Sequence, residues 1–231
     1  MGNDGPVPLL ILYAIVAAVN VTAELADAPG VIHVTKPLLV TVLICWLVVE
    51  RRSTWDPPVT WLALGAACAL AGDILLMPEG TAWFTAGLAS FMAMQICYIV
   101  AFARVPGPGL VRAWRVALVP YVAYWIALMA VIVPTAGAML VPIVVYSLCL
   151  LAMAVSALDL VIRVPQKYGW MVAIGAGLFM ASDSVLALTR FGPISATPAS
   201  NSMTMLTYVV AQALIIVGFA RGQAVAASRS R

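Results

Sequence analysis

Two aspartates stand inside long apolar runs of this sequence, Asp73 in "LAGDILLM" and Asp183 in "FMASDSVLALTRF". A carboxylate inside a membrane costs about 3 kcal/mol or more, so it normally faces a bundle interior or a wet cavity. Two carboxyls in different surroundings can act as acid and base in a hydrolysis, whereas membrane-embedded carboxylates also relay protons in transporters. A third interpretation is structural, with the two aspartates locking helices together through polar contacts.

The composition indicates that these aspartates belong to an integral membrane protein. The chain has 231 residues, of which 64% are hydrophobic and 9% are charged. A soluble domain is usually about half apolar and about a quarter charged, so too few polar side chains are present to cover a water-exposed globule. The net charge of +3 is modest, and no nucleic-acid partner is expected.

Eight apolar runs have about the length that a helix needs to cross a bilayer. They predict an all-α, polytopic membrane helix bundle that forms one domain over residues 1–231. The predicted spans are 7–23, 35–49, 58–77, 82–103, 113–133, 136–160, 169–189 and 202–220. The second is short for a bilayer, and a start one turn after residue 113 is the alternative for the fifth. No basic segment precedes the first run, which is therefore expected to remain as a span rather than be cleaved as a signal peptide.

The basic residues divide unequally between the two ends of an eight-span bundle. Ten lie at the end that holds both termini: Arg51, Arg52, Arg104, Arg112, Arg115, Arg163, Lys167, Arg221, Arg229 and Arg231. Only Lys36 and Arg190 lie at the opposite end. Because basic residues accumulate in cytoplasmic loops, this partition predicts a cell-membrane protein with both termini in the cytoplasm.

The two aspartates are predicted at similar depth in the non-cytoplasmic half of the membrane. Asp73 lies about one turn, and Asp183 about two turns, from the outer end of its span. Small residues precede each aspartate: Gly65 and Ala69 share the helical face of Asp73 at i, i+4, i+8 spacing, and Gly177 and Ala181 line the approach to Asp183. Such residues let helices approach closely. The two motifs occupy the third span of each four-span half, which predicts parallel helices and leaves duplication of a four-span unit open.

Further polar side chains are candidates for substrate binding. Gln95 and Tyr98 share one face of the fourth span, and Tyr208 and Gln212 share one face of the eighth. Alternatively, each of these four only makes hydrogen bonds between helices. Lys36 is the cation nearest to the aspartates, either neutralising one of them or binding an anionic headgroup. Lys36 and Arg190 also fit the pattern of interfacial anchors.

Other chemistries find little support in the sequence. The cysteines lie in apolar runs without paired spacing and are interpreted as buried thiols: Cys45, Cys68, Cys97 and Cys149. The single histidine, His33, is predicted in a loop, so no Ser-His-Asp triad is expected. Two carboxylates alone make a thin site for Mg²⁺ or Ca²⁺, and neither a metal nor another cofactor is predicted.

The motifs around these residues carry a family resemblance over essentially the whole chain. Its "TKPLL", "LAGDILLM", "FTAGLASFMAMQICYIVAF", "GLFMASDSVLALTRF" and "TYVVAQALI" resemble, in order and spacing, the YhhN-like proteins, an eight-span lysoplasmalogenase family. One departure is Gln95, which stands where the family usually has histidine. Because a glutamine does not titrate, a proton relay through this position is in doubt.

The resemblance implies hydrolysis of the sn-1 vinyl ether of a lysoplasmalogen to a fatty aldehyde and a glycerophospho-alcohol. Asp73 and Asp183 would then be the catalytic acid and base, and the aspartate farther from Lys36 would be the acid because an ammonium favours the carboxylate form. Gln95, Tyr98, Tyr208 and Gln212 would position water and the glycerol hydroxyl, with Lys36 on the phosphate. The expected partners are a lysophospholipid and the bilayer. A small proton-coupled transporter is the main alternative, and the oligomeric state is left open.

Overall fold

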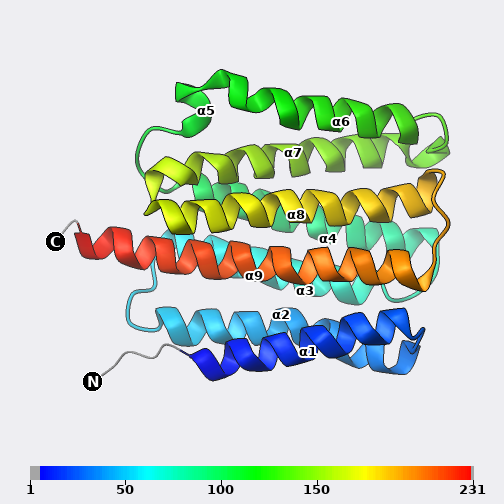
Figure 1. The fold of residues 1–231 in the computed structure, drawn as a ribbon, viewed down its shortest axis with the longest axis horizontal. Coiled ribbons are helices and arrows are strands. Elements are labelled where there is room, and N and C mark those ends of the chain that lie inside the picture. Colours follow the sequence, from blue (N-terminus) through cyan, green and yellow to red (C-terminus); the bar gives the residue numbers. More distant parts are fainter. Residues whose placement is uncertain (1–5, 230–231) are drawn as a thin grey trace.

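The computed structural model describes residues 6–229, which form a bundle of long helices (Figure 1). The α-helices in this range are α1 (Val7–Leu25), α2 (Pro29–Arg51), α3 (Pro57–Leu75), α4 (Thr81–Ala103), α5 (Leu110–Ala113), α6 (Val119–Ile132), α7 (Leu140–Arg163), α8 (Gln166–Phe191) and α9 (Pro198–Arg229). Short 3₁₀ helices cover Arg115–Leu118 and Gly137–Met139. No strand occurs in this part of the chain, so the predicted all-α class is confirmed.

The described residues contain eight helical segments long and apolar enough to cross a membrane, as predicted. The second begins at Pro29, six residues before the predicted start. Proline is well tolerated at the first position of a helix, because its missing N–H has no intrahelical partner there. His33 therefore lies within α2 rather than in the loop that the sequence suggested.

Two other spans differ from their predicted bounds. The fifth is broken into α5, a 3₁₀ turn and α6, with Pro120 in the first turn of α6. The eighth continues as α9 to Arg229, well beyond the predicted end at residue 220. Within this extension, the Nε atom of Arg221 lies 3.3 Å from the Oε1 atom of Glu50 on α2, which ties the end of α9 to the bundle.

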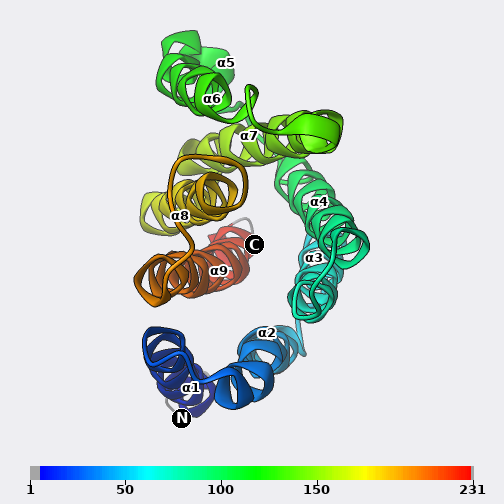
Figure 2. The same ribbon diagram turned by 90° about the vertical axis from the view of Figure 1, so that its right-hand side faces the viewer.

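Successive spans run in opposite directions, so α3 and α8 are parallel, as predicted (Figure 1). Seen end-on, α9 lies between α8 on one side and the α1–α2 pair on the other (Figure 2). It is the most buried span, whereas α6 lies outside α7 and is the least buried. Helices α7, α4 and α3 complete the wall that faces α9 (Figure 2).

The ends of the bundle carry charge as the sequence predicts. Arg51, Arg104 and Arg163 lie at helix ends on the side where α1 begins and α9 ends, while Lys36 and Arg190 lie toward the opposite side (Figure 1). Arg231 lies outside the described residues. Which end faces the cytoplasm stays a prediction.

Glycines bring several helices into close approach. A Cβ atom built on Gly65 of α3 would lie 2.5 Å from the Tyr98 ring on α4, and one on Gly175 of α8 would lie 2.9 Å from the Ala211 carbonyl oxygen on α9. Gly177 differs, because its Cβ position has no neighbour within 4 Å. The prediction that Gly177 supports close helix packing is therefore wrong, and this glycine instead borders a shallow groove between α6 and α8.

Candidate active site

Asp73 is held in the bundle by a tyrosine from another helix. It is 1% exposed on α3, and its Oδ2 atom accepts a hydrogen bond of 2.7 Å from the Tyr208 hydroxyl on α9. The Tyr208 ring packs edge-on against Phe91 and Phe179, with centroid distances of 6.0 and 5.7 Å. Because these contacts fix the ring, they also fix the hydroxyl that orients the Asp73 carboxyl.

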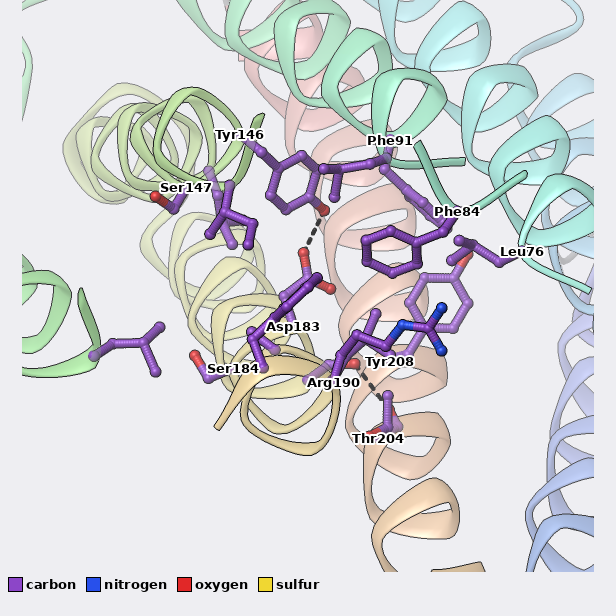
Figure 3. A pocket seen from close by; sticks show the side chains of 18 of the residues that line it. Leu76, Phe84, Phe91, Tyr146, Ser147, Asp183, Ser184, Arg190, Thr204 and Tyr208 are labelled. Carbon is purple, nitrogen blue, oxygen red and sulfur yellow. Dashed lines mark hydrogen bonds between the residues drawn. The ribbon is translucent and has the colours of Figure 1, made fainter. Parts of the chain in front are cut away.

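Asp183 has an equivalent partner that the sequence analysis missed. The Tyr146 hydroxyl on α7 donates a hydrogen bond to the Oδ2 atom of Asp183 on α8 (Figure 3). Tyr146 is 8% exposed and Asp183 is half-buried. The available signal was a lone tyrosine in the otherwise apolar run "PIVVYSLCLL" of the sixth span. Each aspartate is thus positioned by one phenolic hydroxyl from a neighbouring helix.

Both aspartates line one cavity of about 260 Å³. Figure 3 shows Asp183 in this cavity. Tyr146 and Tyr208 line it as well, so the structure brings together the two predicted catalytic residues and their hydrogen-bond partners. One part of the cavity, here called the apolar arm, is lined by Leu128, Met129, Ile143, Leu150, Leu186 and Ala187. The cavity therefore combines two fixed carboxyls with a surface suited to a hydrocarbon chain.

Two cations complete the polar lining, and they are the two that the sequence placed at the non-cytoplasmic end. Lys36 lines the cavity from α2, as predicted, and interacts electrostatically with Asp73 and Glu24. Arg190 lines it from α8, although the sequence analysis favoured an interfacial anchor at this position. Its guanidinium lies over the Phe84 ring, 5.1 Å from the centroid (Figure 3).

Three of the predicted substrate-binding residues lie away from the cavity. Tyr98 donates a hydrogen bond of 3.0 Å to the Oε1 atom of Gln212, and the Nε2 atom of Gln212 donates to the Met94 sulfur at 3.3 Å. Gln95 is fully buried beside Tyr146 and interacts with its hydroxyl, although its amide makes no well-formed hydrogen bond within residues 6–229. Because their polar atoms face neighbouring helices, we do not include these three among the substrate contacts.

The groups that line the cavity are of the kind that transfer protons to and from a bound molecule. Two carboxyls provide an acid and a base, and tyrosine hydroxyls fix their orientation. In the part of the chain that the structure describes, no cluster of three or more His, Cys, Asp or Glu side chains is placed to hold a metal ion.

Comparison with known protein families identifies a family for this chain. The model of the YhhN family matches residues 31–219. This chain belongs to the YhhN family. The matched region contains both aspartates, both of their tyrosine partners and both cavity cations.

Two curated members named lysoplasmalogenase resemble this YhhN chain. One is from Mycobacterium bovis (strain ATCC BAA-935 / AF2122/97) and one from Mycobacterium tuberculosis (strain CDC 1551 / Oshkosh). Each is 32% identical over 171 residues, which cover 71% of this chain and 62% of the relative. The match thus spans less than two thirds of the length of these relatives. No solved structure matches the chain.

Within this YhhN site, Tyr146→Phe is expected to lower kcat about 10–100-fold with little change in KM. The substitution removes one hydrogen bond to a carboxyl, which is worth about 1.5–3 kcal/mol when the partner is charged. The ring and its packing remain, so the loss falls on the orientation of Asp183. Steady-state kinetics of the purified variant measure both constants.

The matched control is Tyr13→Phe, which removes a buried hydroxyl that donates to the Val209 carbonyl at 2.5 Å. Tyr13 does not line the cavity. Its loss should lower the melting temperature and leave kcat within about twofold. An equal fall of kcat in both variants would show that Tyr146 acts only through the fold.

Proposed function

We propose that this protein hydrolyses the sn-1 vinyl ether bond of lysoplasmalogens, releasing a fatty aldehyde and a glycerophospho-alcohol. The observation that carries the proposal is the pair of aspartates, each fixed by a tyrosine, on one cavity with an apolar arm. The two mycobacterial relatives are named lysoplasmalogenase, which supports the same reaction. The substrate and the catalytic roles below belong to this proposal.

The reaction begins when a carboxylic acid protonates the β-carbon of the vinyl ether. This gives an oxocarbenium ion, which water attacks at the carbon bonded to oxygen while a carboxylate takes a proton from that water. The hemiacetal hydroxyl then gives its proton to the carboxylate left by the first step, and the C–O bond to glycerol breaks to give the aldehyde. The leaving glycerol oxygen takes the proton that the second carboxyl received from water and departs as an alcohol. As in glycoside hydrolysis, one carboxyl acts as acid and a second acts on the water and the developing positive charge.

The surroundings of the two aspartates suggest their roles. Burial of Asp73 favours its neutral form, but Lys36 interacts with this carboxyl, and a nearby ammonium favours the carboxylate that the proposal requires. Asp73 is therefore the proposed carboxylate that stabilises the oxocarbenium ion and activates water, and Asp183 is the proposed acid. Tyr208 and Tyr146 hold these two carboxyls at the cavity wall.

The rest of the cavity accommodates the two ends of the lipid. The alkenyl chain occupies the apolar arm between α6, α7 and α8, from which the released aldehyde passes sideways into the bilayer. The glycerophospho group lies toward the end where Lys36 stands, with the ammonium near the phosphate. The active site then opens to the non-cytoplasmic side, in keeping with the predicted orientation.

The test is mass spectrometry of the purified protein incubated with three lysophospholipids that share a headgroup and differ at sn-1. We expect aldehyde from the vinyl ether and no product from the saturated ether or the ester. In D₂O the aldehyde, trapped by reduction, should carry one deuterium on the carbon next to the carbonyl, because protonation occurs there. Cleavage of the ester at a similar rate, or of none of the three lipids, contradicts the proposal.

A further inference from the structure

The cavity holds the two basic residues that depart from the charge pattern of the chain. Ten basic residues lie at one end of the spans in the sequence, and only Lys36 and Arg190 lie at the other. Both of these two line the cavity that contains Asp73 and Asp183. They reach it from different helices, α2 and α8, which lie on opposite sides of α9 (Figure 2). A common role in the cavity explains why Lys36 and Arg190 lie at this end better than separate roles as anchors at the membrane interface.

Arg190 can contact a ligand that enters the cavity from the end of the bundle where α8 ends. It follows Asp183 by seven residues, which is about two turns of α8, so both side chains share one face roughly 10 Å apart along the axis. The residue is exposed, and its guanidinium rests on the Phe84 ring at 5.1 Å. This stacking uses the flat face of the guanidinium and leaves its N–H groups at the edge available (Figure 3).

Within residues 6–229, no acidic side chain forms an ion pair with Arg190. Among the residues that the structure describes, the ion pairs within 4.0 Å join other arginines to Asp56, Asp159 and Glu50. Lys36 also has no ion pair in this range, but it interacts with Asp73 and Glu24 over longer distances. Arg190 is therefore the cavity cation with the most unused capacity for an external anion.

We propose that Arg190, together with Lys36, binds the phosphodiester of the lipid headgroup and selects phosphorylated glycerolipids over neutral alkenylglycerols. A guanidinium presents paired donors that match two phosphate oxygens, which makes arginine well suited to this anion. The three glycerol carbons then extend from the phosphate, which lies at Arg190 and Lys36, to the vinyl ether, which lies at the two aspartates. This inference rests on the proposed function for the identity of the lipid, but the headgroup site itself is tested without turnover.

The experiment measures binding of two saturated-ether lipids to purified protein, 1-O-hexadecyl-glycerophosphocholine and the neutral 1-O-hexadecylglycerol. The native chain should prefer the phosphocholine lipid. Arg190→Gln should weaken its binding about 10–100-fold, the loss expected for a charged hydrogen bond, and change binding of the neutral lipid less than about threefold. Arg190→Lys, which keeps the charge but loses the paired donors, should fall between.

Arg52→Gln is the matched control, because it removes the same charge from an exposed residue at the other end of the bundle and should leave both affinities unchanged. Equal weakening of both lipids by Arg190→Gln, or none, overturns the headgroup assignment. Displacement of the lipid by inorganic phosphate as readily as by glycerophosphocholine would overturn it too, in favour of a site for free anions. A native chain that prefers the phosphocholine lipid but cleaves no vinyl ether would contradict the hydrolase proposal and leave this one standing.

Discussion

Asp73→Asn and Asp183→Asn are each expected to reduce aldehyde release from a lysoplasmalogen by roughly 10²–10⁴-fold, the range that general acid–base groups contribute. Asparagine keeps the size of aspartate and accepts the same tyrosine hydrogen bond, but it neither donates a proton as an acid nor carries negative charge. The Asp183 variant loses the proposed proton donor, and the Asp73 variant loses the group that stabilises the oxocarbenium ion. Initial rates in detergent or in vesicles provide the measurement.

Two controls separate chemistry from folding in these variants. Thermal denaturation should show both variants folded, since neither substitution introduces a charge into the bundle. Asp159→Asn is the matched control, because Asp159 pairs with Arg163 at the opposite end of the bundle, 3.4 Å between Oδ2 and the guanidinium nitrogen, and does not line the cavity. Normal turnover in either cavity variant would remove that aspartate from the catalytic role.

Gly169→Ala is expected to have the largest effect on stability among conservative changes in α8, destabilising the fold by about 1–3 kcal/mol. A methyl group at this position would lie 2.6 Å from both the Leu160 carbonyl oxygen and the Val161 Cα atom of α7. Backbone atoms do not move aside as the end of a flexible side chain does, so α7 and α8 must separate. The melting temperature should fall by roughly 2–10 °C, which calorimetry or a thermal-shift assay in detergent will show.

Gly177→Ala supplies the comparison on the same helix. Its methyl group meets no atom within 4 Å, and alanine is favoured over glycine by about 1 kcal/mol in a helix interior. The two substitutions are therefore expected to shift the melting temperature in opposite directions. A similar fall of the melting temperature in both variants would mean that the lower stability of Gly169→Ala comes from the lost flexibility of glycine rather than from a clash with α7.

The sequence alone determined the class of the protein and the depth of its main polar residues. Hydrophobic runs of span length and the unequal placement of arginines follow from the cost of polar groups in lipid, which acts locally along the chain. The same cost singled out Asp73 and Asp183, because a carboxylate in an apolar run needs a partner or a cavity. The predicted number of spans is correct although several helix ends are wrong by a few residues. Pro29, for example, begins α2 instead of lying in the loop between the first two spans.

Only the tertiary structure decided which polar residues share the cavity. The rotation of each helix and its neighbours are set by packing between side chains distant in sequence, such as Tyr208 with Phe91 and Phe179. This packing brings Tyr146 to Asp183 and aims Arg190 into the cavity, and it directs Gln212 toward Tyr98 instead. Periodicity on one helix predicts a shared face but not what that face meets, because the partner belongs to another helix.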